Sequence, residues 1–325
     1  MPEPGIEFSG AGLAVRSSQA ASIDRREAYP GFPIPPTMNE IFPSSRIWLI
    51  TGCSSGFGRA LASAALASGE RVIATSRQTG ALKDLAVQYP ATCRVLALDV
   101  TNASQVQTVV VQAAEAFGRL DVVVNNAGFG LIGAFEELGQ EQIARSFETN
   151  FFGAMAVIRA SLPILRAQGS GHIVNISAAA VISNYAGFSI YGATKWALEG
   201  ASEALAAELR PLGIHVTLVE PGPFRTEFIG RSMERAQNHL PAYEASSGRF
   251  LRLLESMDGR QPGDPAKAAF AIMAAVDSDS PPLRLVLGRY ANEKRRKQLA
   301  DAERERSAWE SVGLPTDFTA STPNL

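Results

Sequence analysis

The chain has 325 residues, of which 46% are hydrophobic and 19% charged, a composition typical of a globular protein with a large core. Thirty basic residues nearly balance 32 acidic ones, so the formal net charge of −2 gives no electrostatic reason to expect nucleic acid or an anionic membrane surface as a partner. The sequence contains no apolar run long enough for a membrane span, and Cys53 and Cys93 lack the spacing of a zinc site or a disulfide framework, so we expect a cytoplasmic protein without a bound metal.

The two ends of the chain differ from its middle. Residues 1–44 are rich in Pro, Gly and Ser and have no helix or strand period, so we expect a flexible extension. An arm that covers the substrate or contacts a second subunit is the alternative. Residues 45–311 are expected to form one folded domain, and residues 312–325 a C-terminal tail.

Short β-branched segments alternate with helical patterns from Arg46 onward. Strands are expected at Ile47–Thr51, Val72–Ser76, Arg94–Leu98, Val122–Asn125, His172–Ser177, Ile214–Val219 and Leu283–Leu287. Helices are expected at Gly58–Ser68, Asn102–Phe117, Gln140–Ala167 and Ser189–Arg210. Most strands are continuously apolar, as parallel strands buried on both faces are. The alternation predicts a three-layer, doubly wound parallel α/β sheet, the Rossmann fold, whose ligands bind at the carboxyl ends of the strands.

A glycine-rich turn joins the first expected strand to the first expected helix. Glycines allow a tight turn and a close approach of the backbone to a pyrophosphate, and the N-terminus of the following helix attracts the phosphate. The residues expected to bind a dinucleotide here are Gly52, Ser54, Ser55, Gly56, Phe57 and Gly58. A sharp turn without a ligand is the alternative.

The second strand ends in Ser76-Arg77, where sites that prefer NAD carry a carboxylate for the ribose 2′-hydroxyl. The guanidinium of Arg77 matches a 2′-phosphate instead, and Ser55 could assist it. The cofactor predicted from this position is NADP(H). In the alternative interpretation Arg77 is a solvated residue at a helix start.

A tyrosine and a lysine follow the fifth expected strand with helical spacing. Tyr191 and Lys195 are four residues apart, which places both side chains on one face of a helix. A phenol with a pKa of about 10 is a poor acid or base at neutral pH, and a neighbouring ammonium lowers that pKa. The pair is a candidate for moving a proton at a substrate oxygen, although the spacing alone is common on helix surfaces.

Taken together, these segments resemble the short-chain dehydrogenase/reductase family from about Arg46 to Trp309. The matching positions are Thr51–Gly58, Asp99 and Val100, Asn125–Gly128, Asn150, Tyr191 with Lys195, and Pro221 and Gly222 followed by Thr226. The run from Tyr191 to Gly200 and the long C-terminal part look like the branch that contains steroid and retinol dehydrogenases.

The resemblance implies a role for each matching residue. Tyr191 would be the catalytic acid/base, Lys195 would lower its pKa and hold the nicotinamide ribose, and Asn150 would position a water in the proton relay. Asp99 would bind the adenine amine and Val100 the adenine ring. Asn126, Ala127 and Gly128 would line the adenosine ribose, and Thr226 would hold the carboxamide. Pro221, Gly222 and Phe224 complete the implied cofactor-binding residues.

One position departs from the family. The catalytic serine normally stands thirteen residues before the tyrosine, where this chain has Ala178. Losing such a donor costs about 10²–10³ in rate. A local bulge could give the role to Ser177, another donor such as Ser183 or Tyr185 could serve, or the chain could be a weakened variant that still binds cofactor.

The segment 227–262 shows no sheet partner and carries several large apolar side chains, so we expect a helical lid over an apolar pocket that includes Phe129, Ile132 and Tyr185. A docked hairpin with those side chains in ordinary core is the alternative. His172 and His215 are expected to be structural, and His239 either a lid residue without a role or a substrate contact.

The sequence therefore predicts an NADPH-dependent carbonyl reductase or alcohol dehydrogenase for a small apolar carbonyl or alcohol. We expect a homodimer or homotetramer, paired through Gln140–Ala167 and Ser189–Arg210. One rival is a cofactor-binding protein with weak or no turnover, and another is an isomerase, epimerase or dehydratase of the same fold.

Overall fold

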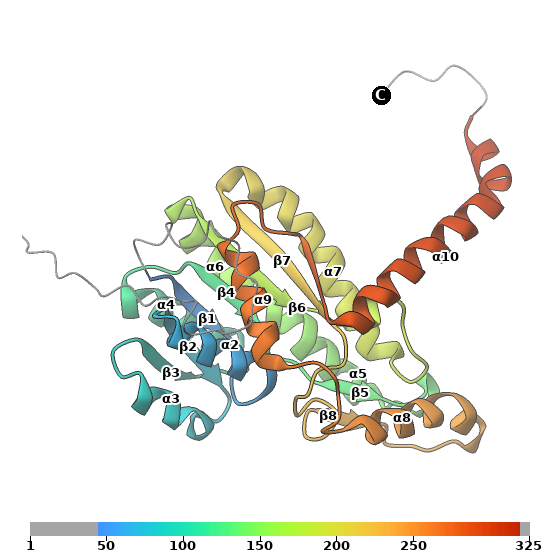
Figure 1. Cartoon of the computed structure of the whole chain (residues 1–325), viewed down its shortest axis with the longest axis horizontal. Coiled ribbons are helices and arrows are strands. Elements are labelled where there is room, and N and C mark those ends of the chain that lie inside the picture. Colours follow the sequence, from blue (N-terminus) through green and yellow to red (C-terminus); the bar gives the residue numbers. More distant parts are fainter. Residues whose placement is uncertain (1–44, 319–325) are drawn as a thin grey trace, which may run out of the picture. The chain divides into compact units, whose positions relative to one another are not determined.

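The computed structural model describes residues 45–318; the predictions for residues 1–44 and for the end of the tail lie outside this range. The described chain is built on a seven-stranded sheet of order β3-β2-β1-β4-β6-β7-β9 (Figure 1). All neighbouring strands are parallel. The strands are β1 (Ile47–Ile50), β2 (Arg71–Ser76), β3 (Cys93–Ala97), β4 (Val122–Asn125), β6 (Gly171–Ile176), β7 (Ile214–Pro221) and β9 (Arg284–Leu287). The predicted doubly wound α/β sheet is confirmed, strand by strand.

Both faces of the sheet are buried, which explains the continuously apolar strands. In β1, Trp48 and Ile50 point into one core cluster, and Ile47 and Leu49 point into the other. The first cluster packs against α2 (Gly56–Ala67), α3 (Lys83–Gln88) and α9 (Pro265–Asp277). The second packs against α4 (Ala103–Phe117), α6 (Gly153–Gln168) and α7 (Ser189–Leu209). The result is a three-layer arrangement of helices, sheet and helices (Figure 1).

The helix expected at Gln140–Ala167 is not continuous α-helix. The structure has α5 (Gln140–Phe147), a π-helical turn at Glu148–Phe152, and then α6. A π turn inserts a residue into the helical repeat and is frequent at functional sites. It carries Asn150, which is buried, and it is followed by Gly153, where a Cβ would lie 2.6 Å from Val100 Cγ2.

The prediction that 227–262 lacks a sheet partner is wrong at one point. Residues Met233–Arg235 form β8, which pairs in parallel with β5 (Gly130–Ile132) in a separate two-stranded sheet. A three-residue strand is too short to show an alternation of apolar and polar residues. The helical part of the segment is confined to α8 (Arg249–Met257) and short turns around Pro241–Gly248.

The described chain ends in α10 (Arg289–Gly313) and a short turn, so the helix runs past residue 312, where we expected the tail to begin. Within residues 45–318, none of the helices combines the length and the apolar character that a membrane span requires. The same residues contain no group of three or more His, Cys, Asp or Glu side chains arranged to hold a metal ion.

Candidate active site

The turn between β1 and α2 is closely packed against the end of β4. Gly52 and Gly56 have φ angles of +70° and +60°, a region that favours glycine. A Cβ at Gly52 would lie 2.8 Å from Ala127 Cα, and a Cβ at Gly58 would lie 2.4 Å from Asn126 Nδ2. Two of the three glycines are therefore required by contacts within the chain itself, in addition to any phosphate that the turn holds.

Asn126 and Thr51 hold this turn in place. Asn126 Nδ2 donates hydrogen bonds to the carbonyl oxygens of Thr51 (2.8 Å) and Gly52 (2.9 Å). Thr51 Oγ1 accepts from the backbone N–H groups of Asn126 (2.9 Å) and Ala127 (3.0 Å). The side chain of Asn126, expected at the adenosine ribose, thus fastens the glycine turn, and the buried Thr51 has a role that sequence analysis missed.

Arg77 and Asp99 lie close together at the ends of β2 and β3. Arg77 is exposed and follows the buried Ser76. Burial raises the pKa of Asp99, but hydrogen bonds from Thr101 and the charge of Arg77 outweigh it, and the pKa falls below its usual value. Asp99 Oδ1 accepts from Thr101 N (3.0 Å) and Thr101 Oγ1 (2.7 Å). This end of the sheet offers a positive charge next to an ionised carboxylate.

Tyr191 and Lys195 lie on the buried side of α7, each 6% exposed. Lys195 Nζ donates to the carbonyl of Ile176 (2.8 Å) and lies 6.0 Å from the centroid of the Tyr191 ring. Burial lowers the pKa of Lys195 to about 8, although the charge of Glu199 raises it. Burial also raises the pKa of Tyr191, so the expected lowering by Lys195 does not dominate in this structure. Both groups are driven toward their neutral forms.

Asn150 lies beside this pair. Its Oδ1 accepts from Phe129 N (2.9 Å), and its Nδ2 donates to Phe129 O (2.9 Å). A Cβ at Gly128 would lie 2.9 Å from Asn150 Oδ1 and 3.7 Å from Lys195 Nζ, so Gly128 separates the two side chains. The π turn therefore brings Asn150 to the same place as Lys195, and its amide holds the loop after β4.

Ser177 and Ala178 point to opposite sides. Ala178 has an extended backbone (φ −163°, ψ 157°) and belongs to the apolar cluster that contains Tyr191. Ser177 donates its N–H to Val219 O (2.8 Å), and its hydroxyl lies on the side of the Glu199 carboxylate without a well-formed hydrogen bond. This geometry argues against a bulge that would turn Ser177 toward Tyr191.

Of the other two candidate donors, Tyr185 contacts α10 through its hydroxyl and Ser183 only through its backbone carbonyl. Tyr185 Oη lies 2.9 Å from Tyr290 Oη, and Lys294 Nζ lies 3.5 Å from the centroid of the Tyr185 ring. Ser183 accepts a hydrogen bond from Lys294 through its carbonyl oxygen. Neither hydroxyl is shown to replace the one that Ala178 lacks.

The segment after β7 returns to the glycine turn. Pro221 ends β7, and Gly222 N donates to Leu287 O (3.0 Å). The rings of Phe224 and Phe57 lie 5.1 Å apart, and a Cβ at Gly56 would lie 3.6 Å from Thr226 Cβ. The structure therefore brings the expected nicotinamide-end residues next to the expected phosphate turn.

An apolar cluster surrounds Tyr191. Its buried members are Ile132, Ala178, Ala180, Phe188, Tyr191 and Leu254, and its half-buried members are Tyr185, Phe228, Ile229, Met233, Phe250, Leu251 and Met257. The ring of Phe228 lies 5.5 Å from that of Tyr191, and Tyr185 stacks on Phe250 at 4.8 Å. The segment 227–262 thus covers Tyr191, and Phe129 is outside the cluster. These rings pack beside Tyr191 and leave 6% of its surface exposed.

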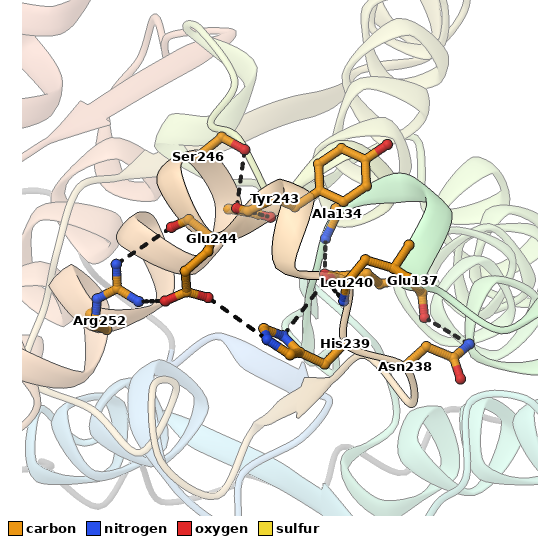
Figure 2. A network of polar contacts seen from close by, with 10 residues as sticks. Ala134, Glu137, Asn238, His239, Leu240, Tyr243, Glu244, Ser246 and Arg252 are labelled. Atoms are coloured by element: carbon orange, nitrogen blue, oxygen red, sulfur yellow. Dashed lines mark hydrogen bonds and ion pairs between the residues drawn. The ribbon is translucent and has the colours of Figure 1, made fainter.

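The segment 227–262 is tied to the rest of the chain through Glu137 (Figure 2). The buried Glu137 carboxylate accepts from the backbone N–H groups of Ala134 (2.8 Å) and Leu240 (2.8 Å). His239, 71% exposed on its side chain, lies 3.8 Å from Glu137 and 3.9 Å from Glu244. His239 therefore contacts carboxylates and is not a member of the apolar cluster.

The other two histidines, His172 and His215, lie near the amino ends of the neighbouring strands β6 and β7. Burial lowers the pKa of His172 to about 3, and His172 Nε2 lies 2.9 Å from Thr217 Oγ1. His172 is therefore neutral at ordinary pH. Its ring lies 5.7 Å from that of His215, centroid to centroid, in a tilted arrangement. Both lie away from the carboxyl ends of the strands, as expected.

Comparison with known proteins places the chain in a family. Residues 46–237 match the family model described as short chain dehydrogenase. An oxidoreductase of Botryotinia fuckeliana is 38% identical over 272 residues, which is 83% of this chain and 98% of that protein. A 3-ketodihydrosphingosine reductase of Bacteroides thetaiotaomicron is 38% identical over 246 residues, 75% of this chain and 88% of that protein.

Solved structures agree with this assignment. A short-chain dehydrogenase from Streptomyces avermitilis superposes with a TM-score of 0.80 at 45% identity, covering 85% of this chain and all of that one. A short-chain dehydrogenase/reductase from Burkholderia phymatum in complex with NAD has the same fold, with a TM-score of 0.69 at 24% identity, covering 87% of this chain and 99% of that one. This chain is a member of the short-chain dehydrogenase/reductase family, and hence an oxidoreductase.

Proposed function

We propose that the chain is an NADPH-dependent carbonyl reductase or alcohol dehydrogenase that acts on an apolar ketone or secondary alcohol, with Tyr191 as the acid/base. The observation that carries the proposal is the burial of Tyr191 in an apolar cluster, one helical turn from Lys195 and beside Asn150. A 3-ketodihydrosphingosine reductase among the relatives, whose name denotes a reductase of a ketone, supports it.

The residues at the carboxyl ends of the strands fit a bound NADP(H). The glycine turn and the N-terminus of α2 would hold the pyrophosphate, and Arg77 would hold the 2′-phosphate. Asp99, Val100, Ala127 and Gly128 would line the adenosine part, with Asn126 supporting the turn from behind. Pro221, Gly222, Phe224 and Thr226 would line the nicotinamide part. When bound, the nicotinamide supplies or accepts the hydride.

The chain's own residues move the proton. In reduction, neutral Tyr191 donates its phenolic proton to the substrate oxygen, and in oxidation it accepts that proton. A buried phenolate without a positive partner is costly, which the raised pKa of Tyr191 reflects. Lys195, whose pKa of about 8 lies near neutrality, can lend its charge when the phenolate forms. Asn150 holds the loop that brings Gly128 against Lys195, and we propose that it also positions a water in the proton relay.

The substrate class follows from the cluster around Tyr191. Its members are aliphatic and aromatic, and a charged or sugar-like group placed among them would lose its water without gaining hydrogen bonds. A medium-sized apolar ketone or alcohol would make apolar contacts with the same side chains, so it would not leave buried polar groups unpaired. We also propose that the protein acts in the cytoplasm as a homodimer or homotetramer paired through α5, α6 and α7.

An assay of NADPH oxidation tests the proposal. Turnover is expected with apolar ketones and little or none with short 2-oxo acids of similar reactivity. Equal turnover of both classes would contradict the proposed substrate class. Ala178 favours a second candidate, a cofactor-binding protein without turnover, and binding of NADPH with no reduction of any ketone, even by Ala178→Ser, would support it. Product formation without net NADPH consumption would instead indicate an isomerase.

A further inference from the structure

The C-terminal helix α10 has a long surface that the rest of the described chain leaves uncovered. Of its residues only Ala291 is buried, and every residue from Ala302 to Phe318 is exposed. Figure 1 shows the first turns of α10 beside the sheet and the later turns beyond it. A helix in a protein gains most of its stability by packing one face against a partner. The outer turns of α10 make no such contact within residues 45–318.

The base of α10 is firmly attached. Arg295 Nη2 lies 2.5 Å from the buried Glu220, and Lys294 Nζ donates to Ala179 O (3.1 Å). Ala291 packs in a small cluster with Ala179 and Ile182. These contacts set the direction of the helix, so its outer turns present a defined face.

That face carries three apolar side chains, Leu299, Ala302 and Trp309, within a pattern of alternating four- and three-residue steps. The other positions of the pattern are occupied by Arg295, which pairs with Glu220, and by Arg306 and Gly313. Leu299 and Trp309 are 59% and 65% exposed, and Val312, which flanks the stripe, is 61% exposed. Arg306 interrupts the stripe, but Glu303 and Glu310 of the same helix compensate its charge. Exposed apolar side chains gathered on one face mark an interaction site.

The distribution of charge along α10 favours a second copy of the same helix as the partner. Residues 289–300 contain five basic residues and one acidic residue, whereas residues 301–313 contain four acidic and two basic residues. Two such helices repel when parallel and attract when antiparallel. An antiparallel pair centred on residue 304 sets Leu299 of each copy against Trp309 of the other, and it brings Arg296 within reach of Glu310. The helix is therefore complementary to itself, as a two-fold interface requires.

A hollow lies where the end of the second helix would arrive. It has a volume of about 310 Å³ and is lined by Val181, Trp196, Glu199, Arg284, Arg295 and Leu299. Trp196 is 52% exposed there. In the antiparallel register, Leu314 and Phe318 of the second copy, which are 66% and 100% exposed in one chain, come to this end of α10.

We propose that α10 pairs antiparallel with α10 of a second copy of this chain and forms a two-fold interface through Leu299 and Trp309. This interface is separate from the α5, α6 and α7 pairing proposed above. The pairing does not depend on catalytic activity, so a measurement of particle mass is enough to test it.

Two full-length charge variants test the pairing. Arg296→Glu with Lys297→Glu makes the exposed part of the basic half acidic, and Glu303→Lys with Glu310→Lys makes the acidic half basic. Each variant repels its own copies, whereas the two variants attract one another. By sedimentation at about 10 µM, we expect each variant alone at half the wild-type mass and their equimolar mixture at the wild-type mass.

A truncation of the apolar contact gives an independent measurement. Trp309→Ala is expected to weaken the pairing about tenfold or more, because a tryptophan that becomes buried in an interface contributes strongly. Val87→Ala, at a site 80% exposed on α3, is the matched control and leaves the mass unchanged. A monomeric wild-type chain, variants of unchanged mass, or a mixture that fails to regain the wild-type mass would each overturn the proposal. Circular dichroism confirms that each variant is folded.

Discussion

Replacing Ala178 by serine tests the chemistry of the site with a single atom. Ala178 is 8% exposed and lies in the cluster that contains Tyr191. A hydroxyl there would donate to the substrate oxygen, and one such donor is worth roughly 3–4 kcal/mol, or about 10²–10³ in kcat. In the free protein the same hydroxyl would lie among mostly apolar side chains, and a buried hydroxyl left without a hydrogen bond costs about 1–3 kcal/mol of unfolding free energy. We therefore expect Ala178→Ser to be faster and less stable.

The assay is NADPH oxidation with an apolar ketone, read together with a denaturant titration of each protein. Ala179→Ser is the matched control, because Ala179 is 7% exposed but packs toward Ala291 and Ile182. It should lose stability without a gain in kcat. An unchanged kcat in Ala178→Ser, or an equal gain in the control, would refute the reasoning and show that the missing hydroxyl does not limit the rate.

Three further predictions concern the cofactor, the lysine and the glycine turn. Arg77→Ala should weaken NADPH binding by about 10- to 100-fold and leave NADH binding unchanged, because it removes a charge-assisted contact to the 2′-phosphate. Both affinities are measured by fluorescence titration, and an equal loss for the two cofactors would refute this prediction. Because the pKa of Lys195 falls from 10.5 to about 8 on folding, the unfolded chain binds its proton more tightly, and the unfolding free energy should rise by about 3 kcal/mol from this group between pH 8 and 10.5. Lys195→Met should reduce the measured rise by about this amount in denaturant titrations across this pH range, whereas the part due to Lys294, whose pKa burial also lowers to about 8, should remain. A variant whose rise equals that of the wild type would show that Lys195 is not responsible. Asn126→Ala should cost about 2 kcal/mol of unfolding free energy through two lost hydrogen bonds, whereas Asn238→Ala, whose one amide bond is 3.4 Å long, should cost much less.

The parallel sheet was predictable because its strands are buried on both faces. Ile47–Ile50 is apolar at every position, and its four side chains divide between the two core clusters. The spacing of Tyr191 and Lys195 placed both correctly on one side of α7. Patterns of this kind lie within one strand or one helix, so the sequence of that element is enough to predict them.

Features that depend on distant contacts were not predictable. The π turn at Asn150 changes the helical repeat by one residue within a long pattern, and it is selected by the contact of Asn150 with Phe129. The side chain of Asn126 could equally have faced a ribose, and only the packing of Gly52 and Gly58 against it shows otherwise. Tyr191 is buried by side chains from several parts of the chain, including the segment 227–262, which is far from it in the sequence. The rise of its pKa that follows from this burial was therefore not expected.

The most direct test of the proposed function compares the wild-type chain with Tyr191→Phe. The substitution removes only the phenolic oxygen and keeps the ring in the apolar cluster, so NADPH binding and the unfolding free energy should change little. NADPH oxidation with an apolar ketone should fall by at least about 10²-fold, the usual contribution of a positioned acid/base group. Undiminished turnover in a variant that still binds NADPH would contradict the assignment of Tyr191 as the acid/base.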